Sequence, residues 1–402
     1  MNVHGLPSTV YSPLSSPSPL NTPVWDDGRW PGLPSLDADL TTEICVIGLG
    51  GSGLTAVSEL IGMGRAVVGI DAADVAAGAA GRNGGLLLAG TSDFHHDAVT
   101  ALGRARVLRI HEMTLEEMQR IAEQAPGTVH VNGSIRVAES QDEMVDCALQ
   151  REAMRDDGLE VRNYDGPMGR GLFIPGDAQF NPLARCRALA TQLLEDGALL
   201  FANTRALSFS GDKVVTARGR ISCQRVIVAV DGRLELLVPE LAGRVRTARL
   251  EMIATAPTTE IAVPCPVSSR YGFDYWQQLT DGTLVLGGGR DTAIDAEWTM
   301  SGEPSQGILE YLERTLRRRL RVLAPITHRW AANVSYTETG LPVLAEVRPA
   351  VWAIGGYSGT GNLMGALAGR AVARRACGEP SEFAALLSYS VAPERNQWSA
   401  SA

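Results

Sequence analysis

Apolar and polar positions change their pattern along the chain, and each pattern predicts a kind of sheet. Three short runs, 44–47, 225–230 and 351–354, are almost wholly apolar, as expected of parallel strands that are buried on both faces. From about 248 to 287 apolar and polar residues alternate instead, with the turn Asp281-Gly282 between two strands, which is typical of antiparallel sheet. The chain is therefore predicted to be mixed α/β, with an antiparallel-sheet domain inserted into a parallel one.

Helical spacing of apolar residues predicts the connecting segments. Residues 98–124 have this spacing throughout and predict one long amphipathic helix. Shorter helices are expected at several other places, namely 52–63, 141–154, 182–194, 307–319 and about 362–377. Residues 1–39 are rich in proline and serine and contain Trp25 and Trp30. This first segment is expected to be extended, either lying over the core through its tryptophans or disordered.

Residues 42–71 combine a strand, a glycine turn, a helix and a second strand. The turn has the spacing Gly48-x-Gly50-x-x-Gly53, which permits a tight turn, close approach of the backbone to a pyrophosphate and tight helix–strand packing. The helix that follows would direct its first amides at the phosphates. Asp71 comes about 20 residues after the turn, where a carboxylate can accept a hydrogen bond from an adenosine ribose hydroxyl. These features predict a dinucleotide site, and the charge of Asp71 argues against a 2′-phosphate.

Two further glycine clusters lie outside this unit, at 81–85 and 355–362. The first surrounds Arg82 and Asn83, so backbone and two side-chain donors would pass along a flat ring, although an ordinary loop has the same composition. The second precedes another helix, about 300 residues after the first turn. Two such helix starts at opposite ends of the chain indicate a ligand that extends across the sheet, which favours FAD over NAD.

Composition excludes several classes of function. The net charge of −9 and the lack of a basic, aromatic-rich patch argue against a nucleic-acid partner. The six cysteines form no CxxC pair and the histidines no ligand pattern, so no metal site is expected and a cytoplasmic location is predicted. No signal peptide and no run of about 18 apolar residues is present.

Four segments together resemble one family of flavoenzymes. AAGRNGG, RVIVAVDG, DGTLVLGGG and TGLPVLAEVRPAVWAIGGYSGTGN are similar to motifs of the D-amino acid oxidase and glycine oxidase superfamily, and GRNGG and GYSGTGN point to the branch of gamma-glutamylputrescine oxidase. The resemblance covers about Pro23 to Pro380. It implies a Rossmann-like FAD-binding domain of 41–95, 170–235 and 335–385 and a substrate domain of 96–169 and 236–334, with an extended segment 1–40 before them and a tail 386–402 after them.

The resemblance also implies where FAD lies and what it does. The backbone of Ala206 would meet the adenine, and residues 356–362 would face the pyrimidine edge of the isoalloxazine. The family transfers a hydride from a carbon that bears an amine to flavin N5, and water hydrolyses the resulting imine. Taken with the motifs above, the expected cofactor-binding residues are Gly48, Gly50, Gly51, Ser52, Gly53, Asp71, Arg82, Asn83, Gly84, Gly85, Ala206, Ala229, Gly232, Gly356, Gly359, Thr360, Gly361 and Asn362.

Departures from the family pattern leave the substrate open. Leu279 and Thr280 stand before Asp281-Gly282, where glycine and D-amino acid oxidases have an arginine for the substrate carboxylate. Val285 stands where monomeric sarcosine oxidases have an oxygen-activating lysine, so molecular oxygen as the electron acceptor is uncertain. No cysteine matches their flavin linkage near 332–335, and non-covalent FAD is expected.

An aromatic wall is the best candidate for the substrate pocket. Such rings suit a cation–π contact or stacking on an aromatic substrate, although most of them are as readily explained as core residues. The members of this group are Tyr271, Phe273, Tyr275, Trp276, Trp330, Tyr336 and Tyr357. The candidate catalytic residues are Tyr275, Tyr357 and Glu251. Glu251, Arg249 or Arg290 would bind a charged substrate end, although each of these residue types more often lies on the surface. The sequence predicts oxidation of a small amine or amino acid. The alternatives are a flavoenzyme of specialised metabolism with an aromatic or heterocyclic substrate, and a flavin-binding partner or redox sensor without catalysis.

Overall fold

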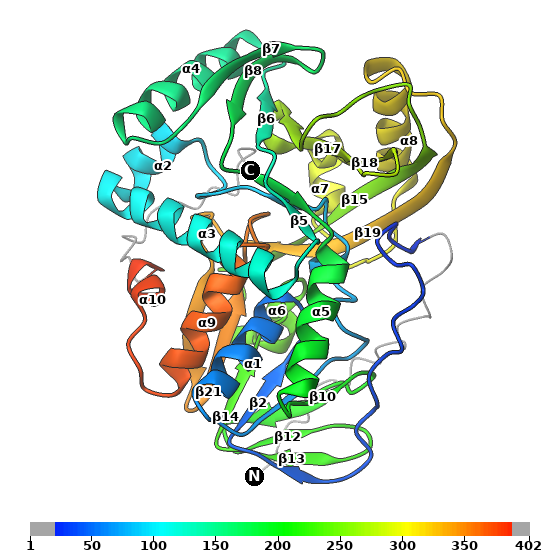
Figure 1. The fold of residues 1–402 in the computed structure, drawn as a ribbon. Helices are drawn as coiled ribbons and strands as arrows, with labels where there is room; N and C mark the ends of the chain where they lie inside the picture. The colour runs from blue at the N-terminus through cyan, green and yellow to red at the C-terminus, as the bar shows by residue number, and fades with distance from the viewer. Residues whose placement is uncertain (1–20, 388–402) are drawn as a thin grey trace.

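The computed structural model describes residues 21–387, which contain two large sheets, one above the other in Figure 1. The lower sheet has six strands, in the spatial order β10 (Leu199–Phe201), β3 (Val67–Ile70), β2 (Ile44–Ile47), β14 (Arg225–Val228), β21 (Val351–Gly355) and β20 (Val343–Arg348). Neighbouring strands are parallel except β20, which is antiparallel to β21. The three apolar runs of the sequence are thus its central strands.

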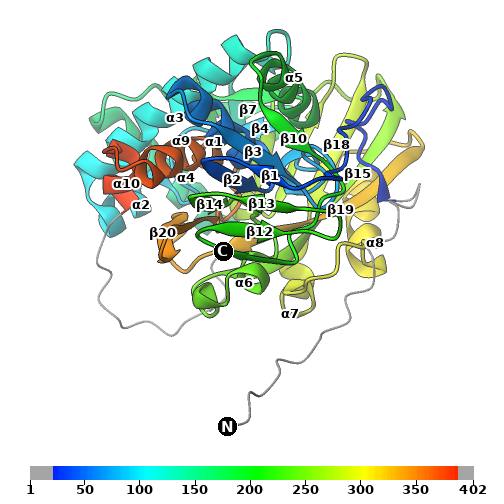
Figure 2. The ribbon, with the colours of Figure 1, turned by 90° about the horizontal axis from the view of Figure 1, so that it is seen from below.

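Both faces of the six-stranded sheet are covered, which explains why its strands are apolar throughout. Helices α1 (Gly51–Gly62), α5 (Pro182–Glu195) and α9 (Met364–Ala376) lie over one face, where Ile44 and Val46 join their core. A four-stranded sheet lies over the other face (Figure 2), where Cys45 and Ile47 pack. Its strands are β1 (Leu40–Thr41), β13 (Arg220–Ser222), β12 (Lys213–Val215) and β11 (Ser208–Ser210).

The upper sheet has eight strands and is antiparallel apart from the β16–β6 pair. In spatial order they are β19 (Ile326–Tyr336), β15 (Arg246–Pro257), β18 (Thr283–Gly288), β17 (Asp274–Gln278), β16 (Val267–Ser269), β6 (Ser134–Val137), β8 (Gly169–Ile174) and β7 (Arg162–Gly166). The predicted fold class is confirmed: a parallel-sheet FAD domain carries an antiparallel substrate sheet.

The register of the eight-stranded sheet separates its two faces. Trp330, Met252, Gly287 and Tyr275 are opposite one another across four strands and therefore share one face. The other face carries Trp276 and its neighbours, which pack against α8 (Gln306–Arg314). The first face belongs to the same core as α1 and α9, so it is the face turned toward the parallel sheet.

The remaining elements join these layers. Three short strands form a small sheet, and the other helices lie around the two large sheets (Figure 1). They are β4 (Leu86–Leu87), β9 (Ala178–Phe180), β5 (Val129–His130), α2 (His95–Leu102), α3 (Arg104–Gln124), α4 (Gln141–Asp156), α6 (Leu234–Leu237), α7 (Ile294–Glu297) and α10 (Glu382–Leu387). The single helix expected at 98–124 is wrong, because Gly103, with φ of +86°, separates α2 from α3. A left-handed residue cannot continue a right-handed helix.

The described part of the N-terminal segment lies against the core. Trp25 is only 5% exposed, and the Trp30 indole Nε1 donates to Asp74 Oδ1 at 3.2 Å. Both tryptophans therefore anchor this segment. Residues 1–20 and most of the expected tail, 388–402, lie outside the described residues. Within residues 21–387, no helix has the length and apolar character needed to cross a membrane.

Candidate cofactor and substrate site

The turn between β2 and α1 fits a pyrophosphate. Gly48 has φ of +106°, and a Cβ atom there would lie 2.8 Å from the carbonyl oxygen of Ala229. A Cβ atom on Gly53 would collide with the carbonyl oxygen of Gly48, so strand and helix pack as the glycine spacing predicts. Helix α1 has Gly50 as its N-cap, no side-chain cap and no acidic residue in its first turn. Its first amides are thus free of side-chain acceptors and suited to phosphate oxygens.

Asp71 lies directly after β3, at the same edge of the sheet. Its carboxylate accepts hydrogen bonds from the amides of Leu49 and Ala73, both at 2.8 Å, and its carbonyl accepts from Thr204 at 2.7 Å. Burial raises the pKa of the Asp71 carboxyl, and the two backbone donors oppose this. Each carboxylate oxygen has a second lone pair for a ribose hydroxyl. The Thr204 bond also places the segment that contains Ala206 next to Asp71.

The 82–85 loop is held through three successive carbonyl groups. Trp330 Nε1 donates to Arg82 O at 2.8 Å, Trp25 Nε1 donates to Asn83 O at 2.9 Å, and the Gln277 amide donates to Gly84 O. These three donors come from the substrate sheet and the N-terminal segment. The Gln277 contact could not be predicted, because one glutamine in an alternating strand has no distinctive spacing.

Arg82 and Asn83 shape this loop through bonds within the protein. Arg82 Nε donates to Ala331 O at 2.7 Å, and its Nη2 donates to Asn21 O at 2.8 Å; burial lowers the Arg82 pKa to about 10. The side chains of Asn83 and Asn362 bond to each other in both directions, at 3.0 and 3.2 Å. The glycine clusters at 81–85 and 355–362, which are far apart in sequence, therefore lie side by side. They are called the second and third glycine clusters, after the first at 48–53.

Asp231 lies just after β14 and holds the third glycine cluster, 355–362, in place through hydrogen bonds. Its carboxylate accepts from Gly356 N at 2.9 Å and from Ser335 N at 3.1 Å, and burial raises its pKa to about 6. This carboxylate ties the 356–362 turn to the end of β19. Gly359, with φ of +90°, has open space around it, whereas Gly232 lies tightly against the backbone of Asn333.

The remaining predicted cofactor residues lie around the same two turns. Ala229 approaches the first turn through its carbonyl oxygen and its methyl group, and Thr360 closes the second turn by donating its hydroxyl to Tyr357 O at 2.7 Å. Gly361 packs on the ring of Tyr357. The structure thus gathers the glycine clusters at one edge of the parallel sheet.

Tyr275, on β17, and Arg290, just after β18, are the candidates for the substrate side of the site. The Tyr275 ring fills the space above two glycines, since Cβ atoms on Gly84 and Gly287 would lie 2.8 and 2.5 Å from it. Burial raises the pKa of the Tyr275 phenol, and the nearby Tyr336 phenol adds to the effect. Arg290 is 3% exposed, and its Cζ lies 4.7 Å from the centre of the Tyr336 ring.

Further aromatic rings surround the same guanidinium. Its Cζ lies 4.9 Å from Trp298 and 5.7 Å from Phe273. Trp298 also packs edge-on against Tyr336, with ring centres 5.6 Å apart. A buried cation enclosed by rings therefore lies close enough to Tyr275 for its charge to act on that phenol. The part played by Trp298 was not predicted.

Other predicted site residues lie elsewhere. Glu251 is on the face of β15 that packs against α8: it accepts from Ser305 N at 2.8 Å and pairs with Arg249 at 3.2 Å. Burial raises its pKa to about 7. Tyr357 is 4% exposed and packs beneath the third cluster, while Tyr271 is half exposed and bonds to Asp146. The structure brings Tyr275, but not Glu251, into contact with the 82–85 loop.

The site combines a phosphate-binding turn at α1, a carboxylate after β3 and two glycine loops that bond to each other. These features define an FAD-dependent oxidoreductase. The family model "FAD dependent oxidoreductase" (DAO) matches residues 43–375, and the chain belongs to this family. FAD is its cofactor and is held without a covalent bond.

Known relatives agree with this assignment. The chain is 26% identical over 386 residues to "Probable oxidoreductase OrdL" of Rhizobium meliloti, covering 88% of this chain and 87% of the relative. It is 25% identical over 392 residues to "Gamma-glutamylputrescine oxidoreductase" of Escherichia coli, covering 87% of each. The crystal structure of glycine oxidase from Geobacillus kaustophilus superposes with a TM-score of 0.71 at 18% identity, covering 86% of this chain and 96% of that one. The last similarity shows the shared fold.

Proposed function

We propose that the chain oxidises the C–N bond of a small amine or amino acid. Bound FAD supplies a hydride acceptor at flavin N5. The substrate loses a hydride from carbon and a proton from nitrogen as its C=N bond forms. Water then adds to this imine, and the nitrogen leaves as a carbonyl compound is formed. Molecular oxygen or another acceptor takes up the two electrons.

The observation that carries this proposal is the contact between Tyr275 and the 82–85 loop. Arg290 is buried among aromatic rings and its charge acts on the Tyr275 phenol, which supports a substrate site on this side of the loop. The amine must be neutral to lose a hydride, and the buried positive charge of Arg290 would disfavour the ammonium form of a substrate bound beside it. The raised pKa of Tyr275 keeps its phenol neutral and able to donate a hydrogen bond.

Arg290 supports a substrate with an anionic end. Leu279 and Thr280 occupy the place of the arginine that the family's amino acid oxidases use, whereas Arg290 offers a guanidinium from the end of β18. Guanidinium groups bind carboxylates through paired hydrogen bonds. The rings around it also suit a substrate with a flat apolar part, so an aromatic or heterocyclic amino acid is included in the proposal.

Anaerobic bleaching of the FAD-loaded protein tests the proposed reaction. We expect the flavin absorbance to disappear with at least one member of a panel of simple amines, amino acids and aromatic amino acids. Matched 2-hydroxy acids, which differ only in the C–O bond, are the control. Bleaching by hydroxy acids alone would contradict C–N oxidation. A flavin that no member reduces would contradict catalysis and favour a flavin-binding protein without a reaction.

A further inference from the structure

Arg185, on α5, is a buried cation beside the first turn of α1. It is 3% exposed, and its Nη2 donates to Thr55 Oγ1 at 3.1 Å while its Nη1 lies 3.4 Å from Gly51 O. Among residues 21–387, its only other hydrogen-bond contact is with the neighbouring Cys186 sulfur, at 3.9 Å. The buried Nε donates to no atom of the described residues. A guanidinium has five N–H donors, so Arg185 retains hydrogen-bonding capacity inside the protein.

The charge of Arg185 is not balanced by any acid of the described chain. Within residues 21–387 no carboxylate forms an ion pair with it, although Arg187, two residues further along α5, pairs with Asp26 at 2.9 Å. Burying an arginine without a counter-charge is costly. The position of Arg185 makes this cost larger, because the guanidinium lies near the positive end of the α1 dipole.

Both positive features are at the turn that the FAD pyrophosphate occupies in this fold. Helix α1 has neither an acidic residue in its first turn nor a side-chain cap, and the nearby Asp71 carboxylate bonds to the amides of Leu49 and Ala73 and not to Arg185. A pyrophosphate brings two negative charges and many acceptor oxygens. It balances the guanidinium and the helix end together.

We propose that Arg185 is the cation that balances the FAD pyrophosphate at the start of α1. Arg185 is thus a cofactor-binding residue that belongs to none of the glycine motifs. Arg185 therefore raises the affinity for FAD and ADP, because both contain the pyrophosphate. It does not change the affinity for riboflavin, which lacks the pyrophosphate.

The test is to measure dissociation constants for FAD, ADP and riboflavin on the full-length protein after FAD removal. Quenching of flavin fluorescence reports FAD and riboflavin, and competition with FAD reports ADP. Arg185→Gln is expected to weaken FAD and ADP by roughly 10- to 100-fold, since a hydrogen bond to a charged group is lost. Arg185→Lys should recover part of the loss, because it retains the charge without the planar donors.

Arg187→Gln is the matched control, because it removes an arginine of the same helix whose charge is already paired with Asp26. We expect it to leave the FAD affinity within about twofold. The proposal is overturned if Arg185→Gln leaves FAD binding unchanged, or if it weakens riboflavin as much as FAD, as a purely structural role requires. If Arg185→Gln does not fold, Arg185→Lys decides the question by the same FAD-to-riboflavin comparison.

Discussion

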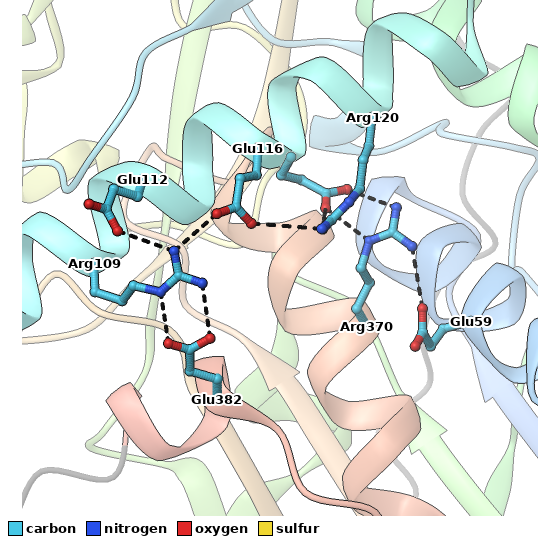
Figure 3. Close-up of polar contacts among 8 residues, drawn as sticks. Glu59, Arg109, Glu112, Glu116, Arg120, Arg370 and Glu382 are labelled. Atoms are coloured by element: carbon cyan, nitrogen blue, oxygen red, sulfur yellow. Dashed lines mark hydrogen bonds and ion pairs between the residues drawn. The ribbon is translucent and has the colours of Figure 1, made fainter.

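Helix α1 meets a largely buried arginine near each of its ends, and the two differ in charge balance. At its first turn, Arg185 has only neutral partners. Toward its other end, Glu59 pairs with Arg370 of α9, which also makes two hydrogen bonds to Glu117 of α3 at 2.9 and 3.1 Å (Figure 3). The two arginines are therefore alike in burial and differ in whether a carboxylate pairs with them, and this difference underlies the binding role proposed for Arg185.

Removal of Arg370 is expected to give the largest effect. Arg370→Leu leaves the fully buried Glu117 with only the half-exposed Arg120 as its ion-pair partner. We expect a loss of about 3–5 kcal/mol in the free energy of unfolding, because breaking a buried pair leaves an uncompensated charge. Urea unfolding of the FAD-saturated protein measures it.

The double variant with Glu117→Leu and Arg370→Leu controls for this prediction. It removes both charges and should regain most of the lost stability. FAD affinity should stay close to that of the native protein, in contrast to Arg185→Gln. A loss below about 1 kcal/mol for Arg370→Leu would show that this cluster is no more than a surface network.

Glu251 provides an intermediate case, since it is buried and only one of its oxygens has a hydrogen-bond partner. Burial raises its pKa from 4.5 to about 7. Between these pH values the folded protein holds the proton more tightly than the unfolded chain. The stability that this group contributes is therefore complete below about pH 4.5 and lost as the pH rises to about 7.

Glu251→Gln, which stays neutral, should remove this pH dependence. Relative to the native protein, the variant should become more stable as the pH rises. The difference in free energy of unfolding should increase by up to about 3 kcal/mol from about pH 5 to about pH 8. Urea unfolding across this range measures the gap. Glu310→Gln, on the exposed face of α8, is the control and should give a flat difference. A flat difference for Glu251→Gln as well would refute the raised pKa.

The smallest effect is expected at the outer end of the cluster in Figure 3. Arg109 bonds to Glu112, Glu116 and Glu382, all solvent-exposed. Glu382→Gln should give no measurable change in the urea midpoint, because exposed pairs are screened by water and two partners remain. A clear shift would show that α10 needs this contact to stay docked.

The cofactor side of the molecule was predictable because its requirements are local in sequence. Gly48, Gly53 and Asp71 lie within one strand–turn–helix–strand unit, and each has a geometric reason that a single residue type satisfies. This unit and the distant glycine turns predict FAD correctly, while the strand patterns predict the fold class and the four motif segments predict the family. The contribution of each residue to FAD binding stays a prediction.

The substrate side was harder to predict because both faces of its sheet are buried. Alternation along β15 and β17 separates Glu251 from Met252 and Trp276 from Tyr275, but it does not say which set meets the cofactor. The packing of α8 on one face decides this. The sequence also does not indicate that Arg185 is buried, because an arginine in an amphipathic helix ordinarily lies on the solvated side.

The reciprocal amide bond between Asn83 and Asn362 joins segments that are 279 residues apart in the chain. During synthesis the ribosome must therefore release most of the polypeptide before the two loops meet, and domains generally fold as units as the chain emerges. FAD is accordingly expected to bind late, after most of the chain has been synthesised. Chains terminated before Asn362 are therefore expected to be released colourless, however well their first strands had folded.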